Sequence, residues 1–205
     1  MLCTSAQVKE QWPGLTGTSE DDRIAQAMVL VSGEFARYLD RTDEETGQSL
    51  LERFEDREEV IEGCDSFITV RGLPIREISE VVEADRPADL DDADPLVEDE
   101  DFVVRRKFIE RIDSSGHPQD WKRWVRVTYS GGFDPVEDPA EENPLPVPAD
   151  MQLHAATRAR HLAQNWTNLF KDSEQVGTGS VNRVRDELPK MIREYLDKFR
   201  PPPIG

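Results

Sequence analysis

The sequence predicts an α+β protein that is mainly α: a small helical bundle with an inserted antiparallel β-hairpin or sheet region, extended loops and a C-terminal arm. Apolar residues recur at helical spacing towards both ends of the chain, and short segments rich in Val, Ile and Phe, separated by Gly and Pro, fill its middle. We expect a single domain across residues 1–205, with N-terminal helices at 1–40, a β-rich insertion at 50–130 and C-terminal helices at 150–200.

The N-terminal part is predicted to form two helices. Thr4 can cap a short helix over residues 6–12, which Pro13 and the following glycine end. Ser19 then precedes three acidic residues in a first helical turn, where the helix dipole favours negative charge. The second helix, roughly 19–39, carries one apolar stripe, formed by Ile24, Met28, Val31, Phe35 and Tyr38.

The middle of the chain changes to the two-residue period of β-strands. Within residues 121–129, Val125, Val127 and Tyr129 alternate with residues of the opposite face, as expected of a half-buried strand. The stretch 83–101 holds ten acidic residues against one basic residue, and we expect it to loop out of the sheet as a solvated segment. Residues 131–149 hold five prolines and five acids, which predicts an extended connector.

Two helical segments are predicted in the C-terminal part. The first follows Pro148 and presents an apolar face formed by Leu153, Ala156, Ala159, Ala163, Trp166 and Phe170. Gly177–Ser180 breaks the chain, and Pro189 should kink or restart the second segment, because proline is costly inside a helix. The apolar stripe of the second segment consists of Val184, Leu188, Met191, Ile192, Tyr195 and Phe199, and Arg200 with three prolines ends it.

Composition excludes several classes of protein. The net charge is -18, with +3 on residues 151–205 and therefore -21 on the first 150, which argues against non-specific nucleic-acid binding. Two cysteines are too few for a disulfide scaffold or a cysteine-cluster zinc site. The longest apolar run, residues 27–31, is too short to span a membrane, and no secretory signal is visible. We expect a soluble protein of a cytosol-like compartment.

No catalytic, metal or cofactor site is predicted. His154 and His161 are seven residues apart on one helix, too far for a metal-binding pair one turn apart. Neither cysteine has a base nearby in the sequence, and the Gly177–Ser180 loop lacks the lysine of a phosphate-binding P-loop. Trp121 and Trp124 lie among basic residues, but cross-strand packing explains them better than base stacking in so acidic a chain. We therefore do not expect an enzyme.

The order of these features resembles the head–tail connector, or head-completion adaptor, proteins of tailed bacteriophages, which form a ring beneath the portal. Four stretches carry the resemblance and together span nearly the whole chain. They are the N-terminal half through Ala36–Leu39, the element ITVRGLPIREI at 68–78, the block WVRVTYSGGF at 124–133 followed by VPAD and a helix, and the Gly-Thr-Gly-Ser loop with the last helix ending YLDKFR at 195–200. The acidic stretch 83–101 and the connector at 134–149 depart from the family pattern.

The resemblance implies a structural protein of the virion neck, at the head–tail interface, that is made in the host cytoplasm. Its implied partners are the portal, neighbouring copies in a ring of twelve, and the next neck or tail protein, with no membrane involved. DNA would pass through the lumen without specific binding, since carboxylates there repel its phosphates. Adaptors of this kind engage the portal through their C-terminal region, so the predicted docking residues are Leu188, Met191, Ile192, Tyr195, Phe199 and Arg200.

Alternatives remain open for both the segment and the protein. The C-terminal stripe could instead complete the subunit's own helical bundle. The protein could be an acidic DNA mimic or another protein-binding module, as the stretch 83–101 suggests, although Pro87 and Pro95 favour a loop over a rigid element. A metal-dependent hydrolase that uses the same carboxylates ranks third.

Overall fold

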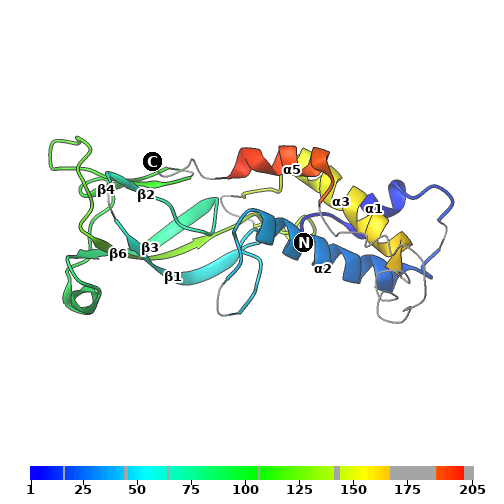
Figure 1. Cartoon of the computed structure of the whole chain (residues 1–205), viewed down its shortest axis with the longest axis horizontal. Helices are drawn as coiled ribbons and strands as arrows, with labels where there is room; N and C mark the ends of the chain where they lie inside the picture. The colour runs from blue at the N-terminus through cyan, green and yellow to red at the C-terminus, as the bar shows by residue number, and fades with distance from the viewer. Residues whose placement is uncertain are drawn as a thin grey trace, which may run out of the picture. The chain divides into compact units, whose positions relative to one another are not determined.

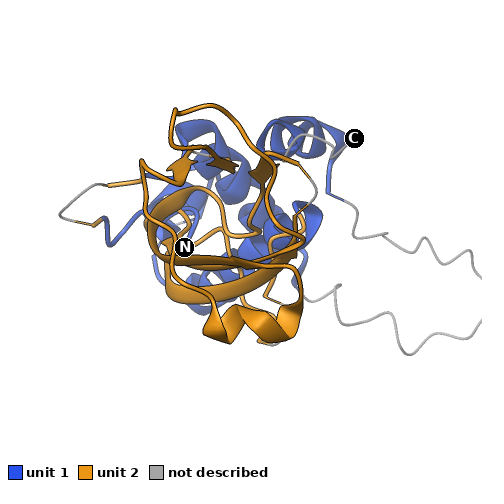
Figure 2. Ribbon diagram, turned by 90° about the vertical axis from the view of Figure 1, so that its left-hand side faces the viewer, with its two compact units in different colours: residues 1–39, 135–139, 146–200 blue, residues 40–134, 140–145, 201–205 orange. Residues whose placement is uncertain are grey.

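The structure, a computed structural model, describes residues 1–15, 17–43, 46–63, 65–105, 107–140, 144–166 and 188–200. The chain divides into two compact units, coloured separately in Figure 2. Unit 1 comprises residues 1–39, 135–139 and 146–200, and unit 2 comprises residues 40–134, 140–145 and 201–205. That they behave as a single domain, as expected from the sequence, stays a prediction. Five features singled out in the sequence lie outside the described residues: Cys64, Phe170, Gly177–Ser180, Val184 and the three prolines at 201–203.

Unit 1 is built from helices (Figure 1). They are α1 (Ser5–Glu10), α2 (Asp21–Tyr38), α3 (Ala149–Gln164) and α5 (Lys190–Leu196), which continues into the 3-10 helix η2 (Asp197–Phe199). Thr4 caps α1 as predicted. Its hydroxyl accepts a hydrogen bond from the Gln7 N–H at 3.1 Å, and the Gln7 side chain accepts one from the Thr4 N–H at 2.8 Å. α5 begins directly after Pro189, which confirms a fresh start at that proline.

The predicted stripe of α2 lies in the core of unit 1. Ile24, Val31 and Phe35 are fully buried, and α2 packs on α3, whose buried face is rich in alanine. Arg158 of α3 is buried as well, and its Nε and Nη2 each donate a hydrogen bond of 2.9 Å to the carboxylate of Glu34 on α2. This bidentate pair sets the position of α3 along α2, because both bonds require one orientation of the guanidinium plane.

Unit 2 contains two three-stranded antiparallel sheets (Figure 1), with the strand orders β1-β6-β3 and β2-β5-β4. The strands are β1 (Phe54–Glu62), β2 (Phe67–Ile68), β3 (Ile75–Ala84), β4 (Phe102–Val104), β5 (Ile109–Arg111) and β6 (Trp124–Gly131). Every second residue of β6 is buried, so the alternation predicted for this segment is confirmed. The core of the unit joins both sheets, since Tyr129 of β6 and Ile109 of β5 belong to one buried cluster.

The predicted fold class is wrong in one respect: the protein is not mainly helical. Helix accounts for about 33% of the described structure and strand for about 26%. The difference comes chiefly from β1 and β3, which extend over nine and ten residues. Acidic residues occupy many of their positions, and such residues are depleted in strands generally, so only short apolar stretches such as Val60-Ile61 indicate a strand in the sequence.

The acidic stretch 83–101 leaves the sheet after Ala84, and most of its residues are exposed, as expected of a solvated segment, but it stays against unit 2. Glu83 is buried near the end of β3, and Pro87–Asp92 form a 3-10 helix, η1, whose Leu90 is buried against the end of that strand. Further along, the Leu96 N–H donates a hydrogen bond of 2.8 Å to the Val81 carbonyl. The buried Leu90, the Leu96 backbone and the ion pairs of Asp91 with Arg126 and of Glu83 with Arg111 therefore hold the stretch on unit 2.

Candidate docking surfaces

Most of the residues predicted to dock on a partner pack inside unit 1. Leu188, Ile192 and Tyr195 are buried, and Phe199 is half-buried. The ring of Tyr195 lies 4.7 Å from that of His154 on α3, measured between centroids. Most side chains of the stripe therefore pack into the core of unit 1. Its role in docking stays a prediction, and the buried side chains are not available for it in this arrangement.

Met191 and Arg200 are the two predicted docking residues with exposed side chains. Met191 on α5 is 64% exposed. The Arg200 guanidinium lies 4.5 Å from the centre of the Tyr38 ring, and its Nη2 donates to the Tyr38 carbonyl at 3.1 Å. Arg200 therefore ties the end of η2 to α2, while its side chain stays partly exposed. Tyr38 makes a second contact with η2: its hydroxyl donates a 2.9 Å hydrogen bond to Asp197, and loss of hydration together with this bond raises the pKa of the hydroxyl.

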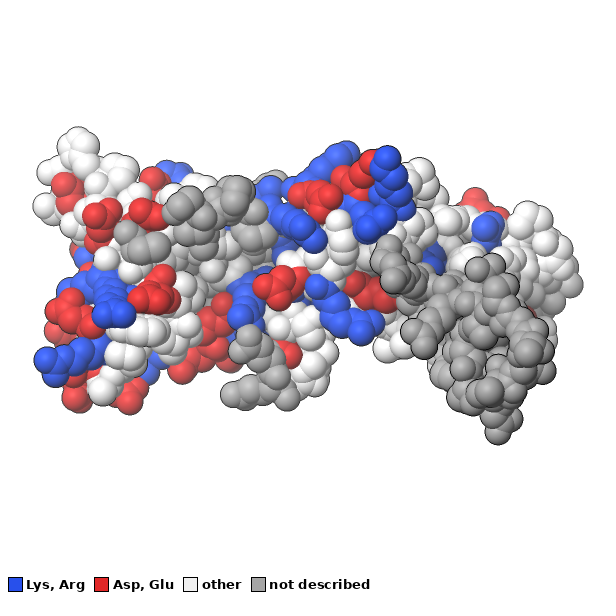
Figure 3. All heavy atoms as spheres, viewed as in Figure 1, with Lys and Arg blue, Asp and Glu red and all other residues white. Residues whose placement is uncertain are grey.

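Basic side chains gather on the same part of unit 1. They form the blue area over α5 in the upper centre of Figure 3. The basic residues of α5 and η2, with the residue that follows, are Lys190, Arg193, Lys198 and Arg200. Glu194 and Asp197 lie among them, so residues 188–200 carry four bases against two acids, a net charge of +2 in a chain of net charge -18, and this surface suits an acidic partner surface.

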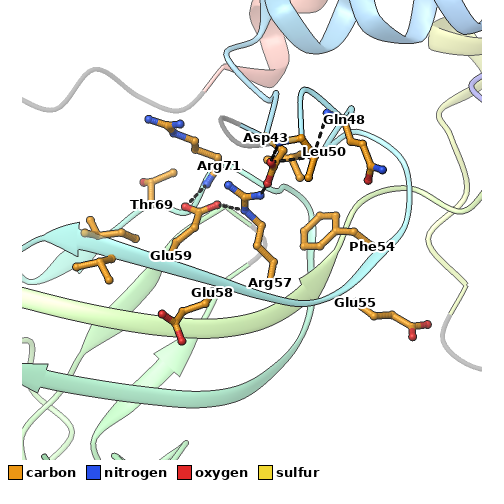
Figure 4. A pocket seen from close by; sticks show the side chains of 13 residues that line it. Asp43, Gln48, Leu50, Phe54, Glu55, Arg57, Glu58, Glu59, Thr69 and Arg71 are labelled. Atoms are coloured by element: carbon orange, nitrogen blue, oxygen red, sulfur yellow. Dashed lines mark hydrogen bonds and ion pairs between the residues drawn. The ribbon is translucent and has the colours of Figure 1, made fainter. Parts of the chain in front are cut away.

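A second candidate surface is an open groove of about 790 Å³ on unit 2. It is lined by three segments: residues 43–50, strand β1, and Thr69 with Arg71, which follow β2 (Figure 4). β1 contributes residues from both of its faces, including Glu58 and Glu59, so the groove runs along the edge of the strand. In Figure 4, Glu59 points towards Arg71 whereas Glu58 points to the other side of the strand.

A hydrogen-bonded network centred on Glu59 supports this edge. Its Oε1 accepts from Arg57 Nε at 2.8 Å and from the Tyr129 hydroxyl at 2.6 Å, and its Oε2 accepts from the Arg71 N–H at 3.1 Å. Arg57 also pairs with Asp43. Burial and the charge of Glu59 raise the pKa of Tyr129, so its hydroxyl stays protonated and donates at neutral pH. The groove therefore offers a preorganised acidic wall.

Across the residues that the structure describes, no three His, Cys, Asp or Glu side chains lie close enough to hold a metal ion. Nor does any helix in those ranges combine the length and the apolar character needed to cross a bilayer. In the groove, the Glu59 carboxylate is engaged by Arg57, by the Tyr129 hydroxyl and by the Arg71 N–H.

Comparisons with known proteins give matches among solved structures. No protein-family model matches the chain, and no curated protein does. The chain is similar to a chain in the neck of an empty GTA (gene transfer agent) particle computed with C6 symmetry, at 12% identity and a TM-score of 0.47, over 98% of this chain and 90% of that one. It is also similar to a chain in the neck of a native GTA particle computed with C12 symmetry, at 11% identity and a TM-score of 0.42, over 98% and 89%. Both are neck chains.

The groove is the feature that sequence reasoning misses. Residues 54–62 lie within the predicted β-rich region 50–130, but they hold five acids, and this composition does not predict a groove along their edge. One signal was available: Val60 and Ile61 are adjacent apolar residues within this acidic run, as expected where a strand has one side chain on each face. The pairing of Glu59 with Tyr129, by contrast, has no signal in either segment alone.

Proposed function

We propose that this protein is a structural head-to-tail adaptor of a phage-like particle, a ring-forming neck protein that joins the portal to the next neck or tail component. The observation that carries the proposal is the order of connector-like stretches along the chain, two of which meet in space. The Gly72 N–H, in the stretch 68–78, donates to the Tyr129 hydroxyl at 2.9 Å, and the Gly132 N–H, in the stretch 124–133, donates to the Pro74 carbonyl at 2.9 Å.

The ring is proposed to contain twelve copies, as the resemblance implies. In a closed ring each copy meets its two neighbours through two different surfaces, so the contacts are heterologous. Native mass spectrometry of the full chain, alone and with purified portal, tests this directly. We expect a portal complex with a copy number that matches the portal. A monomer that never associates with the portal would count against the adaptor role.

The C-terminal segment is proposed to meet the portal through its exposed part. Deleting residues 188–205 would also remove the buried Ile192 and Leu196 from the core, so a point substitution is the cleaner test. Met191→Asp should leave unit 1 folded and weaken portal binding at least tenfold, since it places a carboxylate in a docking site. Leu153→Asp on α3, which is 55% exposed, is the matched control and should bind normally. Equal binding by both variants would place the docking surface elsewhere.

The acidic charge is proposed to keep DNA from sticking as it passes through the lumen. Asp89, Asp92 and Asp94 lie in exposed positions on or beside η1. Replacing all three with lysine should slow DNA ejection from particles that carry the variant, because attraction replaces repulsion of the phosphates. Replacement with asparagine is the control and should have a smaller effect. Unchanged ejection with the lysine variant would remove this part of the proposal.

A DNA mimic remains the second candidate, and one observation favours it. A mimic needs its acids on an ordered element, and the acids of η1 are held on the sheet by the buried Leu90. A nuclease-inhibition assay with the purified chain separates the two functions. Inhibition that disappears in the Asp89, Asp92 and Asp94 asparagine variant would favour the mimic, whereas an adaptor leaves the nuclease active.

A further inference from the structure

One edge of the first sheet, along β1, has no neighbouring strand among the residues that the structure describes. In the order β1-β6-β3, β1 pairs there with β6 on one side only. The Gly63 N–H donates to the Arg123 carbonyl at 2.8 Å, and the register with β6 is constant from there back to residue 57. Since hydrogen-bonded and non-hydrogen-bonded pairs alternate in antiparallel sheets, the backbone groups of Glu58, Val60 and Glu62 point away from β6.

These outward-facing groups border the groove described above. Among the backbone hydrogen bonds of the described residues outside regular strands and helices, none involves Glu58, Val60 or Glu62. The side chain of Val60 is 49% exposed, and those of Glu58 and Glu62 are 59% and 58% exposed. Along this strand edge, exposed acidic side chains therefore alternate with an exposed apolar side chain. The backbone N–H and C=O groups of the same three residues point outward as hydrogen-bond donors and acceptors.

The charge of the edge indicates what could pair with it. β1 has five acids against one base, Arg57, and that base is already engaged by Asp43 and Glu59. Arg126 of β6 lies 3.9 Å from Glu58, and Arg123, just before β6, lies 3.2 Å from Glu62; the acids of both pairs are largely exposed, and acids still outnumber bases along this edge. The β1 edge of a second copy carries the same five acids, so the pairing of two β1 edges is opposed by like charge. A strand that alternates basic and apolar residues would match Glu58, Val60 and Glu62 position by position.

We propose that the β1 edge binds an extended, basic segment of a partner protein, which adds to the sheet as a fourth strand. Backbone hydrogen bonds to residues 58, 60 and 62 would supply affinity, and the acidic side chains would select a basic sequence. The network of Glu59, Arg57 and Tyr129 holds β1 in place for this, so little ordering is needed on binding. The inference does not depend on the neck assignment, because it rests on unit 2 alone.

The first test uses three short capped peptides and the full chain. One alternates lysine and valine, one alternates lysine and proline with the same charge, and one alternates glutamate and valine. We expect the lysine–valine peptide to bind at least tenfold more tightly than the other two in isothermal titration calorimetry. It should also slow amide hydrogen exchange at Glu58, Val60 and Glu62. Equal binding of the lysine–proline peptide, which cannot form a strand ladder, would reduce the effect to charge attraction and overturn the proposal.

The second test changes the edge itself. Val60→Pro removes an outward N–H while leaving the bonds to β6, and should abolish binding of the lysine–valine peptide. Val60→Ala is its control and should retain most of the binding, because its N–H remains. Glu58→Gln with Glu62→Gln keeps the backbone intact and should weaken binding more than tenfold at low salt, so the test holds even if the proline variant unfolds. Two outcomes would overturn the assignment to a basic partner. One is that the Val60→Pro variant and the Glu58→Gln, Glu62→Gln variant bind the lysine–valine peptide as tightly as the parent does. The other is that these variants keep peptide binding but lose self-association of the chain.

Discussion

Replacing Glu83 with leucine should destabilise unit 2, because it removes the nearer carboxylate partner of the buried Arg111 and leaves it with the more exposed Asp101, whose Oδ1 lies 3.4 Å from Nη1. Glu83 and Arg111 are 9% and 8% exposed. Arg111 Nε and Nη2 donate to Glu83 Oε1 at 3.2 and 3.0 Å, and the Lys122 N–H donates to Oε2 at 3.1 Å. Since Glu83 lies on β3 and Arg111 on β5, this pair joins the two sheets of the unit.

The size of the effect follows from what Arg111 retains. Removing one partner of a buried ion pair costs about 3–5 kcal/mol. The lower end applies here, because Arg111 Nη1 keeps the Ile112 carbonyl at 2.9 Å as an acceptor. We therefore expect Glu83→Leu to lower the free energy of unfolding by about 3 kcal/mol. The double variant Glu83→Leu, Arg111→Met removes both charges, and its loss should be about 1–2 kcal/mol, smaller than that of either single variant.

Urea unfolding followed by tryptophan fluorescence measures these differences. Trp121 is 5% exposed, and its ring centre lies 5.9 Å from the Arg111 guanidinium carbon, so its emission reports on the folding of unit 2. The four variants of the double-mutant cycle should show a coupling energy of about 2 kcal/mol or more. Additive losses in the double variant would refute the reasoning, since they would mean that the two side chains stabilise the unit independently.

Two further predictions concern unit 2, with one control in unit 1. Gly72→Ala should lower the free energy of unfolding by about 1–3 kcal/mol, as measured by thermal melting, because the new Cβ would lie 2.8 Å from the Tyr129 hydroxyl and closer still to the Phe54 ring. Gly33→Ala is the control: a Cβ there would meet open space, so this variant should be as stable as the parent or more stable. Burial would raise the pKa of Asp134, but the Leu145 N–H and the charge of Arg76 outweigh it and lower the pKa. Because the folded pKa is depressed, Asp134 contributes stability above about pH 4, the unfolded value, and loses it as the pH falls through the folded value. Asp134→Asn should therefore differ most from the parent near pH 7 in urea titrations and converge with it in acid; a constant difference across pH would contradict this.

Local signals in the sequence are enough to predict several elements. The stripe from Ile24 to Phe35 follows helical spacing and is buried, and β6 follows the two-residue period with Val125, Val127 and Tyr129 inside. Thr4 has the side chain that a helix start needs, and it caps α1. These predictions succeed because each depends on neighbouring residues only.

The features that sequence reasoning misses depend on pairs of residues far apart in the chain. Glu83 is buried because Arg111 meets it, and Glu59 is half-buried because Tyr129 donates to it. Neither acid differs in its own segment from acids that stay exposed, so the segments alone predict solvated charge. The same holds for the docking stripe: Ile192 and Met191 are adjacent and apolar, yet packing in unit 1 buries the first and leaves the second exposed.

Unit 1 is assembled from segments that are separated in the chain, which has a consequence for synthesis on the ribosome. α2 ends at Tyr38, and α3, on which it packs, begins only at Ala149. At about 5–20 residues per second, several seconds pass between the two. Throughout that interval the apolar face of α2 lacks α3, while the strands of unit 2 emerge and can pair. Nascent chains should therefore complete their sheets before their helices, and the α2 segment is the part of the nascent chain most exposed to chaperone capture.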